Sequence, residues 1–417
     1  MVGLGYVGLP LACLAAEKGW QVIGIARDRQ KLDLINRHRS PIPEKLLQRW
    51  LRRVTIRATA DFAPIASADV VVICVPTPVD HHNNPDFSAI IASAKNIAKY
   101  LRRGQLVVLE STVSPGVSEE VLQPILESHG LRAGRDFLLA HCPERIDPGN
   151  ATWTVRNIPR VIGGFDHPST RRAMKFYQSI IEAPLQAMAS LKEAEAVKIL
   201  ENSFRDVNIA FVNEIAMSFE RLGIDTVDVI RGAATKPFAF LPHWPSAGVG
   251  GHCIPVDPYY LIERAKKSGF NHAFLKLARA INNGMPEHAL SRLFAALKSK
   301  RRAPGRVTIG VLGLAYKKNV SDTRESPAYR IIALLRQRRL RFHTFDPHIP
   351  GESTVRTINE FLRRVDAVIL MTDHDEFARI TPQKLKKNGI IAVVDGKNLF
   401  DKRAMTRSGI AYRGIGR

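Results

Sequence analysis

The first ten residues contain the feature that most limits what this chain can fold into. They read Met-Val-Gly-Leu-Gly-Tyr-Val-Gly-Leu-Pro, a match to G-x-G-x-x-G, and an apolar helical pattern and then an apolar strand pattern follow. Glycines at this spacing allow a tight turn and a close approach of the backbone, and the N-terminus of the next helix attracts a pyrophosphate. The pattern therefore predicts a dinucleotide-binding unit. Its candidate cofactor-binding residues are Gly3, Gly5, Tyr6, Val7 and Gly8.

Two features beside this motif depart from the usual pattern. Only Met1 and Val2 precede the glycines, so the first strand is either short or begins upstream. The second strand ends in Ala26-Arg27-Asp28, where an acid for the adenosine ribose is expected near Ala26. Alanine followed by Arg27 is the pattern that tolerates a 2′-phosphate, whereas Asp28 could supply the acid from a shifted register. We expect NAD as the cofactor and keep NADP open because of Ala26 and Arg27.

Strand, polar turn and helix then alternate along the chain. Strand patterns at 69–75, 105–109 and 137–140 are each followed by polar residues, among them Thr77, Thr112 and Glu144-Arg145. This alternation predicts a doubly wound parallel sheet, in which ligands bind beyond the carboxyl ends of the strands. Each polar residue alone could be a helix cap or turn residue. Together at one sheet edge they indicate a site.

A long helical pattern at 190–222 follows, and a second αβ unit begins near residue 302. On the helix, Lys198 and Asn202 share one face within an apolar sequence, so they either line a site or pack against a partner subunit; an exposed polar stripe is the alternative. The predicted fold is α/β, with two Rossmann-like doubly wound parallel-sheet domains joined by a helical middle domain with a long central helix. The expected domains are 1–185 for NAD(P) binding, 186–300 for the helical centre and dimerisation, and 301–417 for a second nucleotide ligand.

The glycine-rich stretch at 248–258, Gly-Val-Gly-Gly-His-Cys-Ile-Pro-Val-Asp-Pro, holds the candidate nucleophile Cys253. Glycines let the backbone approach a bound molecule, and a nearby charge can hold a cysteine as thiolate. A buried cysteine in a glycine-rich turn is the alternative. The four cysteines form no CxxC pair, so neither a metal site nor a disulfide framework is expected.

Composition and charge limit the classes of partner that this protein is expected to bind. The net charge of +22 suits nucleic acid as a partner, but the basic residues are spread along the chain without a nucleic-acid-binding motif. No apolar run reaches membrane-span length and no signal-peptide pattern is present. We expect a cytoplasmic protein that binds neither nucleic acid nor membrane.

These segments together resemble the UDP-glucose/GDP-mannose dehydrogenase family over almost the whole chain. The matching motifs are GLGYVGLP (3–10), CVPTP (74–78), ESTVSPG (110–116), CPERIDPGN (142–150), EAVKILENSFRDVNIAFVNE (195–214), GVGGHCIPVDP (248–258) and GLAYKKNVSDTRESPA (313–328). The forms PERIDPGN and GGHCIPVDPYYL are most similar to the branch that oxidises UDP-N-acetylglucosamine or a related UDP-N-acetylhexosamine.

The resemblance implies a two-step oxidation of the sugar C6 alcohol to a carboxylate through a thiohemiacetal and a thioester on Cys253. It assigns oxyanion stabilisation to Lys198 with Asn202, and a base or water-orienting role to Asp257. Thr112 would hold the catalytic water or the nicotinamide side, and Glu144 would lie near the sugar and the hydrolytic water. The resemblance also implies that Thr77 and Thr112 contribute to cofactor binding. The substrate set is Glu144, Arg145, Lys198, Asn202, Gly250, Lys317 and Arg324.

The resemblance leaves some alternatives open. UDP-glucose is the nearest competing substrate, and a catalytically silent nucleotide-sugar-binding homologue is a further alternative. A homodimer through the long central helix, or a higher homo-oligomer, is expected from the family. The product would be an uronate sugar for polysaccharide biosynthesis.

Overall fold

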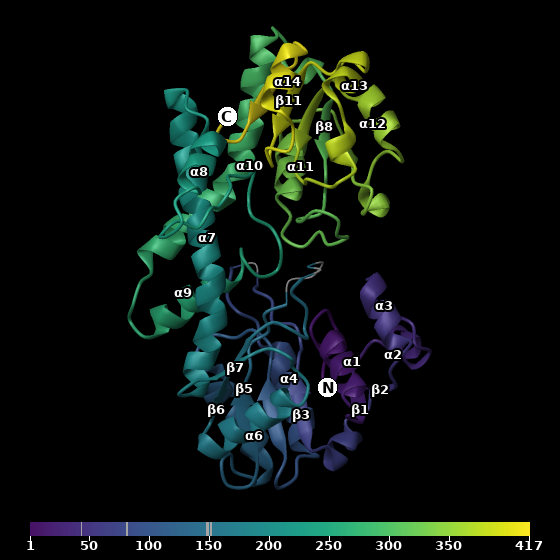
Figure 1. Cartoon of the computed structure of the whole chain (residues 1–417), viewed down its shortest axis with the longest axis vertical. Coiled ribbons are helices and arrows are strands. Elements are labelled where there is room, and N and C mark those ends of the chain that lie inside the picture. Colours follow the sequence, from purple (N-terminus) through teal and green to yellow (C-terminus); the bar gives the residue numbers. More distant parts are fainter. Residues whose placement is uncertain (43, 81, 147–149, 151) are drawn as a thin grey trace. The chain divides into compact units, whose positions relative to one another are not determined.

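A computed structural model describes residues 1–42, 44–80, 82–146, 150 and 152–417 (Figure 1). The chain divides into two compact units, the first made of residues 1–201 and 259–271 and the second of residues 202–258 and 272–417. Helices α7 (Leu191–Leu222) and α9 (Asp257–Lys267) contribute residues to both units. The part of the CPERIDPGN motif at 147–149 lies outside the described residues.

The first unit is built on a mainly parallel sheet. Strands β3 (Val70–Ile73), β4 (Leu106–Leu109) and β5 (Leu138–His141) are parallel neighbours, and β6 (Arg160–Gly164) runs antiparallel to β5 and parallel to β7 (Leu185–Ala187). Strands β1 (Val22–Ile25) and β2 (Ile56–Thr59) form a parallel pair. Val2 bridges to both Ile25 and Ile73 in parallel, so it occupies the position of the first strand between β1 and β3.

Both faces of this sheet are covered because its strands are apolar on both sides. In β4, Val107 and Leu109 pack into the same cluster as Ile90, whereas Leu106 and Val108 pack with Phe176 on the other face. The helices of this unit are α1 (Gly8–Glu17), α2 (Arg29–Asn36), α3 (Lys45–Leu51), α4 (Ser88–Ala98), α5 (Gln123–Leu126) and α6 (His167–Gln178).

The second unit contains a parallel sheet with the strand order β12-β11-β10-β8-β9. Its strands are β8 (Ile309–Leu312), β9 (Phe342–Phe345), β10 (Ala367–Leu370), β11 (Ala392–Asp395) and β12 (Ala411–Gly414). Its helices are α8 (Thr226–Ala233), α10 (Ala273–Ser299), α11 (Pro327–Gln337), α12 (Ile358–Arg364), α13 (Pro382–Lys387) and α14 (Lys402–Arg407). Helices α10 and α11 cover one face and α12 to α14 the other (Figure 1).

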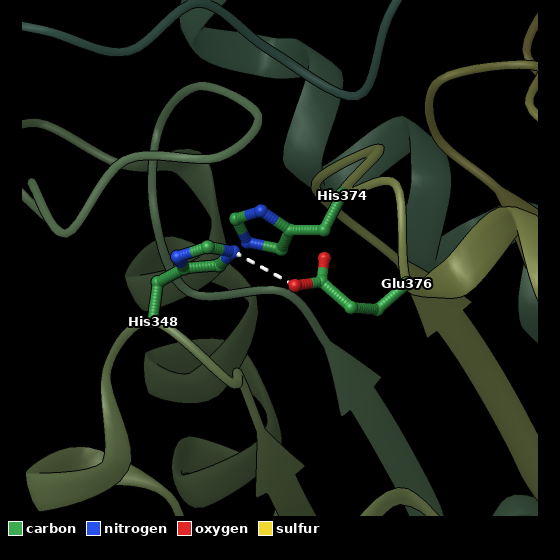
Figure 2. Close-up of side chains that lie close together, drawn as sticks. All are labelled: His348, His374 and Glu376. Carbon is green, nitrogen blue, oxygen red and sulfur yellow. Dashed lines mark ion pairs between the residues drawn. The ribbon is translucent and has the colours of Figure 1, made fainter. Parts of the chain in front are cut away.

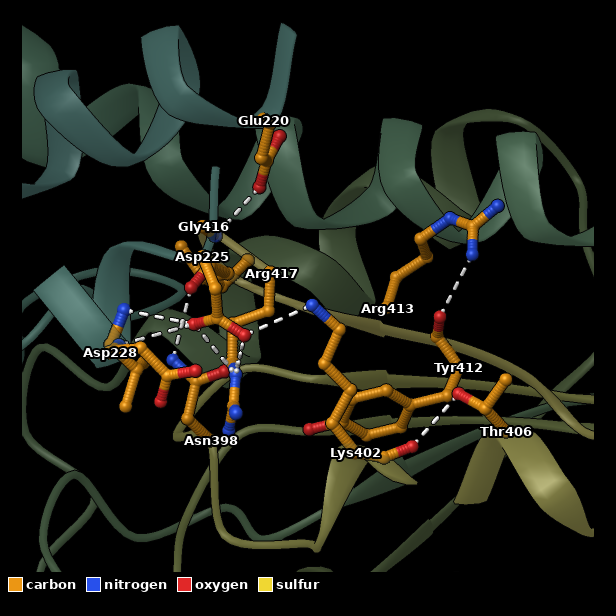
Figure 3. Close-up of polar contacts among 12 residues, drawn as sticks. Glu220, Asp225, Asp228, Asn398, Lys402, Thr406, Tyr412, Arg413, Gly416 and Arg417 are labelled. Atoms are coloured by element: carbon orange, nitrogen blue, oxygen red, sulfur yellow. Dashed lines mark hydrogen bonds and ion pairs between the residues drawn. The ribbon is translucent and has the colours of Figure 1, made fainter. Parts of the chain in front are cut away.

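Asp225 links the start of α8 to the end of the chain within this unit (Figure 3). Its carboxylate caps the helix by accepting from the Val227 N–H at 3.1 Å, and it also pairs with Arg417 and Lys402, each at 3.0 Å. Burial raises the pKa of Asp225, but the hydrogen bonds and charges of Lys402 and Arg417 outweigh it, so the pKa lies below its ordinary value. The carboxylate is therefore held as an anion.

The predicted fold class is confirmed: the protein is α/β, with two Rossmann-like sheets and a long central helix. Four strands were not predicted, namely β2, β6, which is antiparallel to β5, β7 and β12. Each contains a charged, polar or glycine residue that interrupts the kind of apolar run by which β3 and β4 were recognised. Among the helices that the structure describes, none combines the length and the apolar character needed to cross a bilayer.

Candidate active site

The glycine turn of the first unit has the geometry that a dinucleotide requires. Gly3 has φ +99°, and a Cβ there would lie 2.4 Å from the carbonyl oxygen of Cys74. A Cβ on Gly8 would lie 2.0 Å from the carbonyl oxygen of Gly3, whereas a Cβ on Gly5 would meet no atom within 4 Å. Gly3 and Gly8 thus make the tight turn, and Gly5 faces open space into which a pyrophosphate fits. No side chain caps the N-terminus of α1, so its N–H groups suit an anion.

The end of β1 carries no ribose-binding acid in the expected place. Ala26 is half-buried, Arg27 is exposed, and Asp28 caps α2 by accepting from the Lys31 N–H at 3.1 Å. The carboxylate of Asp28, considered above as the acid in a shifted register, is therefore engaged with its own helix.

The sheet edge brings together the threonines that the sequence placed at strand ends. The Thr77 hydroxyl donates to the backbone carbonyl of Thr112 at 2.8 Å, and the Ser111 hydroxyl donates to the Val75 carbonyl at 2.7 Å. The Tyr260 hydroxyl also donates to the Thr77 carbonyl. The loops after β3 and β4 are thereby tied to each other, because parallel neighbouring strands end at the same edge.

Glu144, after β5, belongs to a buried charge cluster that the sequence reasoning missed. The Arg160 guanidinium donates to Glu110 at 2.8 Å and reaches Glu144 at 3.5 Å, and the Tyr177 hydroxyl donates to Glu110 at 2.6 Å. Burial raises the pKa of Glu110 to about 7, although Arg160 acts in the opposite direction. One guanidinium thus offsets two carboxylates. One sign of this cluster was present in the sequence, because Glu110 is a charged residue directly after an apolar strand.

Arg145, a predicted substrate-binding residue, forms an ion pair with Glu201. Its guanidinium also donates to the carbonyl of Pro159 at 2.7 Å. Its contacts within this unit therefore hold it between α7 and the segment before β6.

Helix α7 carries a buried polar stripe, as the pattern at 190–222 indicated. In the first unit, the Glu195 carboxylate accepts from the backbone N–H groups of Gly116 at 2.5 Å and Ser118 at 2.8 Å, so it holds the segment that follows Thr112. Burial raises the pKa of Glu195 to about 7. Lys198 lies one turn further along and is 9% exposed, and it forms no ion pair with the residues that the structure describes.

In the second unit the stripe continues with paired residues. Asn202 donates to the Asp257 carboxylate at 2.5 Å, and both side chains are buried. Further along, the Arg279 guanidinium donates to Asp206 at 2.5 Å, and the Asn213 amide donates to Asn282 at 2.9 Å. The predicted pair of Lys198 and Asn202 thus lies on the buried face of one helix, although the two residues belong to different units.

The Cys253 loop is shaped by its glycines and by the segment at 316–327. Gly251 has φ +93° and donates to the carbonyl of Arg324 at 3.0 Å, and a Cβ on Gly250 would lie 2.8 Å from the Cβ of Tyr316. Gly250, a predicted substrate-binding residue, is therefore packed against Tyr316. Substitution at either glycine would push the two loops apart.

Cys253 itself is half-buried directly before α9. Its carbonyl oxygen accepts from the N–H groups of Val256 at 3.0 Å and Asp257 at 2.8 Å, which closes a turn at the start of the helix. A helix N-terminus favours an anion such as a thiolate. Cys13, Cys74 and Cys142 are buried, and burial raises the pKa of each. Cys253 is therefore the cysteine suited to act as a nucleophile.

Two residues that the sequence analysis did not identify, Asp346 and His374, anchor the loop that carries Lys317. The Asp346 carboxylate accepts from the N–H groups of Leu314 at 2.7 Å and Ala315 at 2.9 Å. His374 approaches the same carboxylate at 2.9 Å through Nε2, and its Nδ1 accepts from the Asn319 N–H at 2.9 Å. Arg324, at the other end of the loop, pairs with Asp322 at 2.5 Å.

His348, His374 and Glu376 are close enough together to suggest a metal site (Figure 2). The His348 imidazole lies against that of His374 and faces Glu376 at 3.4 Å. Both ring nitrogens of His374 are, however, already used by Asp346 and Asn319. Because a metal ligand needs an available nitrogen lone pair, His374 serves instead as an anchor for the 313–319 loop.

The fold and these sites define a class: dehydrogenases that bind a nicotinamide dinucleotide at the glycine turn of a Rossmann-type sheet. The chain belongs to the UDP-glucose/GDP-mannose dehydrogenase family. It matches the family's NAD binding domain at residues 1–181, its central domain at 192–284 and its UDP binding domain at 310–402. It is therefore an NAD-dependent nucleotide-sugar dehydrogenase, an oxidoreductase that acts on a CH–OH group.

Individual relatives are similar over more than nine-tenths of their length. A UDP-N-acetyl-D-mannosamine dehydrogenase of Pyrococcus horikoshii is 35% identical, over 100% of this chain and 98% of the relative. A UDP-N-acetyl-D-glucosamine 6-dehydrogenase of Pseudomonas aeruginosa is 33% identical, over 93% of each. The solved structure of the Pyrococcus horikoshii enzyme has a TM-score of 0.94 at 35% identity, over 100% of this chain and 98% of that one.

Proposed function

We propose that the protein is a 6-dehydrogenase of a UDP-N-acetylhexosamine, which it oxidises from the C6 alcohol to the carboxylate. The observation that carries the proposal is the turn at Cys253, in which a half-buried thiol precedes a helix N-terminus and a buried Asp257–Asn202 pair follows. The relatives named for N-acetylmannosamine and N-acetylglucosamine sugars support this substrate class. Within this class UDP-N-acetylglucosamine is the favoured substrate, and UDP-glucose is the competing substrate.

In the chemistry proposed for Cys253, the sugar remains covalently bound to the enzyme between the two oxidations. NAD held at the Gly3–Gly8 turn would supply the acceptor for the hydride of each oxidation. The Cys253 thiolate adds to the aldehyde carbon formed first, which gives a thiohemiacetal; loss of the second hydride gives a thioester, and water then releases the carboxylate and the thiol. Asp257, oriented by Asn202, acts as the base for the water.

In the first unit, three residues take further roles in the proposal. Lys198 is a buried amine without an acidic partner among the described residues, which suits it to stabilise an alkoxide or thiohemiacetal oxyanion. Thr112 holds the catalytic water or the nicotinamide side, and Glu144, held by Arg160, lies near the sugar and the hydrolytic water. Lys317 and Arg324 bind the nucleotide sugar from the anchored loop of the second unit.

The domain division at 1–185, 186–300 and 301–417 is part of this proposal, and the three matched family regions support it. A homodimer that forms through α7 is also part of this proposal. The support is an apolar stripe on one face of that helix, where Leu200, Phe204, Phe211 and Leu222 are 67%, 47%, 57% and 66% exposed.

A substrate and cofactor panel tests the function. We expect the highest kcat/KM with UDP-N-acetylglucosamine or its manno epimer, a lower value with UDP-glucose, and two cofactors reduced per sugar. A ratio of one would eliminate the thioester route. Cys253→Ala should abolish acid formation while leaving UDP-sugar binding measurable, and Cys142→Ala is the control because that thiol is fully buried. A Cys253→Ala enzyme that forms uronate at the normal rate would refute the site.

A further inference from the structure

The adenosine end of the cofactor site depends on the residues that follow β1. In Rossmann units the end of the strand after the glycine turn meets the adenosine ribose. Here the Gly3 N–H donates to the Ile25 carbonyl at 2.8 Å, and Val2 pairs with Ile25 in parallel. Ala26 and Arg27 therefore leave the sheet beside the glycine turn.

The position at which NAD-specific sites place an acidic side chain is occupied by Ala26. Ala26 is half-buried against the apolar cluster of α1 and α3, and its N–H donates to the Thr59 carbonyl at 3.1 Å. The acidic residues that follow β1 and β2 each accept a hydrogen bond from a nearby backbone N–H group. Asp28 accepts from Lys31 N–H at 3.1 Å, and Asp61 accepts from Ala63 N–H at 2.9 Å.

Basic side chains occupy the same segment instead. Arg27 and Arg29 are exposed, and neither forms an ion pair with the residues that the structure describes. A guanidinium presents N–H donors in a planar fork that matches phosphate oxygens. A carboxylate at position 26 would repel a 2′-phosphate, whereas the methyl group of Ala26 leaves room for one.

We propose that the adenosine-ribose subsite accepts a 2′-phosphate through Arg27, so that the enzyme uses NADP in addition to NAD. Arg27 and Ala26 are then the specificity-determining residues, one by attraction and the other by the absence of a carboxylate. The inference concerns the cofactor alone and does not depend on which UDP-sugar is oxidised or on Cys253.

Binding of two adenosine fragments to the full chain tests this without a sugar substrate. Adenosine 2′,5′-bisphosphate and 5′-AMP differ only in the 2′-phosphate, and calorimetry gives the dissociation constant of each. We expect the bisphosphate to bind at least as tightly as 5′-AMP. Arg27→Gln should weaken the bisphosphate by about tenfold or more, as expected for loss of a hydrogen bond to a charged group, with little effect on 5′-AMP.

Two further variants sharpen the result. Ala26→Asp should weaken the bisphosphate and strengthen 5′-AMP, because the carboxylate repels phosphate and accepts from the ribose hydroxyls. Arg39→Gln, an exposed arginine just beyond the other end of α2, is the matched control and should change neither. In turnover with the preferred UDP-sugar, NADP should support reduction, and Arg27→Gln should lower kcat/KM for NADP selectively.

The opposite results would overturn the proposal. One is a bisphosphate that binds the native protein at least tenfold more weakly than 5′-AMP. Another is Arg27→Gln weakening both fragments equally, which would make Arg27 part of a general basic surface. NAD-dependent turnover with no NADP reduction would reject the inference while leaving the proposed function intact.

Discussion

The side-chain amide of Asn202 donates a hydrogen bond of 2.5 Å to the buried carboxylate of Asp257. Asn202 comes from α7 and Asp257 begins α9, and the N–H of Asp257 donates to the Cys253 carbonyl. One residue of the long helix therefore fixes the orientation of the carboxylate next to the thiol turn. In the proposed mechanism, this pair positions the base that activates water for thioester hydrolysis.

Asp257→Asn should separate oxidation from hydrolysis. The amide is nearly isosteric and its oxygen still accepts from Asn202, so we expect a folded protein whose kcat falls by about 10²–10⁴, the usual contribution of a general base. The thioester on Cys253 should then accumulate and appear as a mass increase of the intact protein. The exposed Asp228→Asn serves as control. Turnover near the normal rate, without an adduct, would remove Asp257 from the hydrolytic step.

Arg160→Met should destabilise the first unit strongly. Removing the guanidinium leaves Glu110 and Glu144 buried without their shared counter-charge, and breaking a buried pair in this way costs about 3–5 kcal/mol. Adding Glu110→Gln should recover part of the loss. Urea unfolding measures both variants, with Arg171→Met as the exposed control. A stability equal to that of the control would show that the cluster contributes nothing.

Glu195 should make stability depend on pH. Its folded pKa, about 7, lies above its ordinary value of 4.5 because of burial. The stability it gives is therefore fully present below pH 4.5 and is lost as pH rises towards 7 and above, by up to about 3 kcal/mol.

Unfolding of the native protein and Glu195→Gln across pH 4–8 measures this effect. The difference in unfolding free energy between the two should change over that range, and the exposed Glu214→Gln is the matched control for loss of a surface carboxylate. A constant difference for Glu195→Gln would mean that burial does not control this carboxyl group.

Phe211→Glu should disrupt the proposed dimer. A charge in the centre of the apolar stripe on α7 must be desolvated on association, whereas Arg205→Glu, on another exposed face of the same helix, need not be. Size-exclusion chromatography with light scattering should show a dimer for the native protein and the control, and a monomer for Phe211→Glu. A dimeric Phe211→Glu protein would place the interface elsewhere.

The sequence was sufficient for features that depend on local pattern. The glycine spacing at 3–8 predicted the turn that Gly3 and Gly8 make, and the apolar runs located β3, β4 and β5 with Thr77 and Thr112 at one edge. Both follow from rules that act over a few residues: steric limits on φ and the burial of strands on two faces.

Only the tertiary structure decided which charged groups meet. Glu110 and Arg160 are 50 residues apart, and Asp346 and His374 are 28 apart, so no local pattern joins them. The same holds for Glu195, whose partners are backbone N–H groups and therefore leave no signature in the sequence. A buried charge is tolerated only where the completed fold supplies its partner, and that partner is known only once the chain has packed.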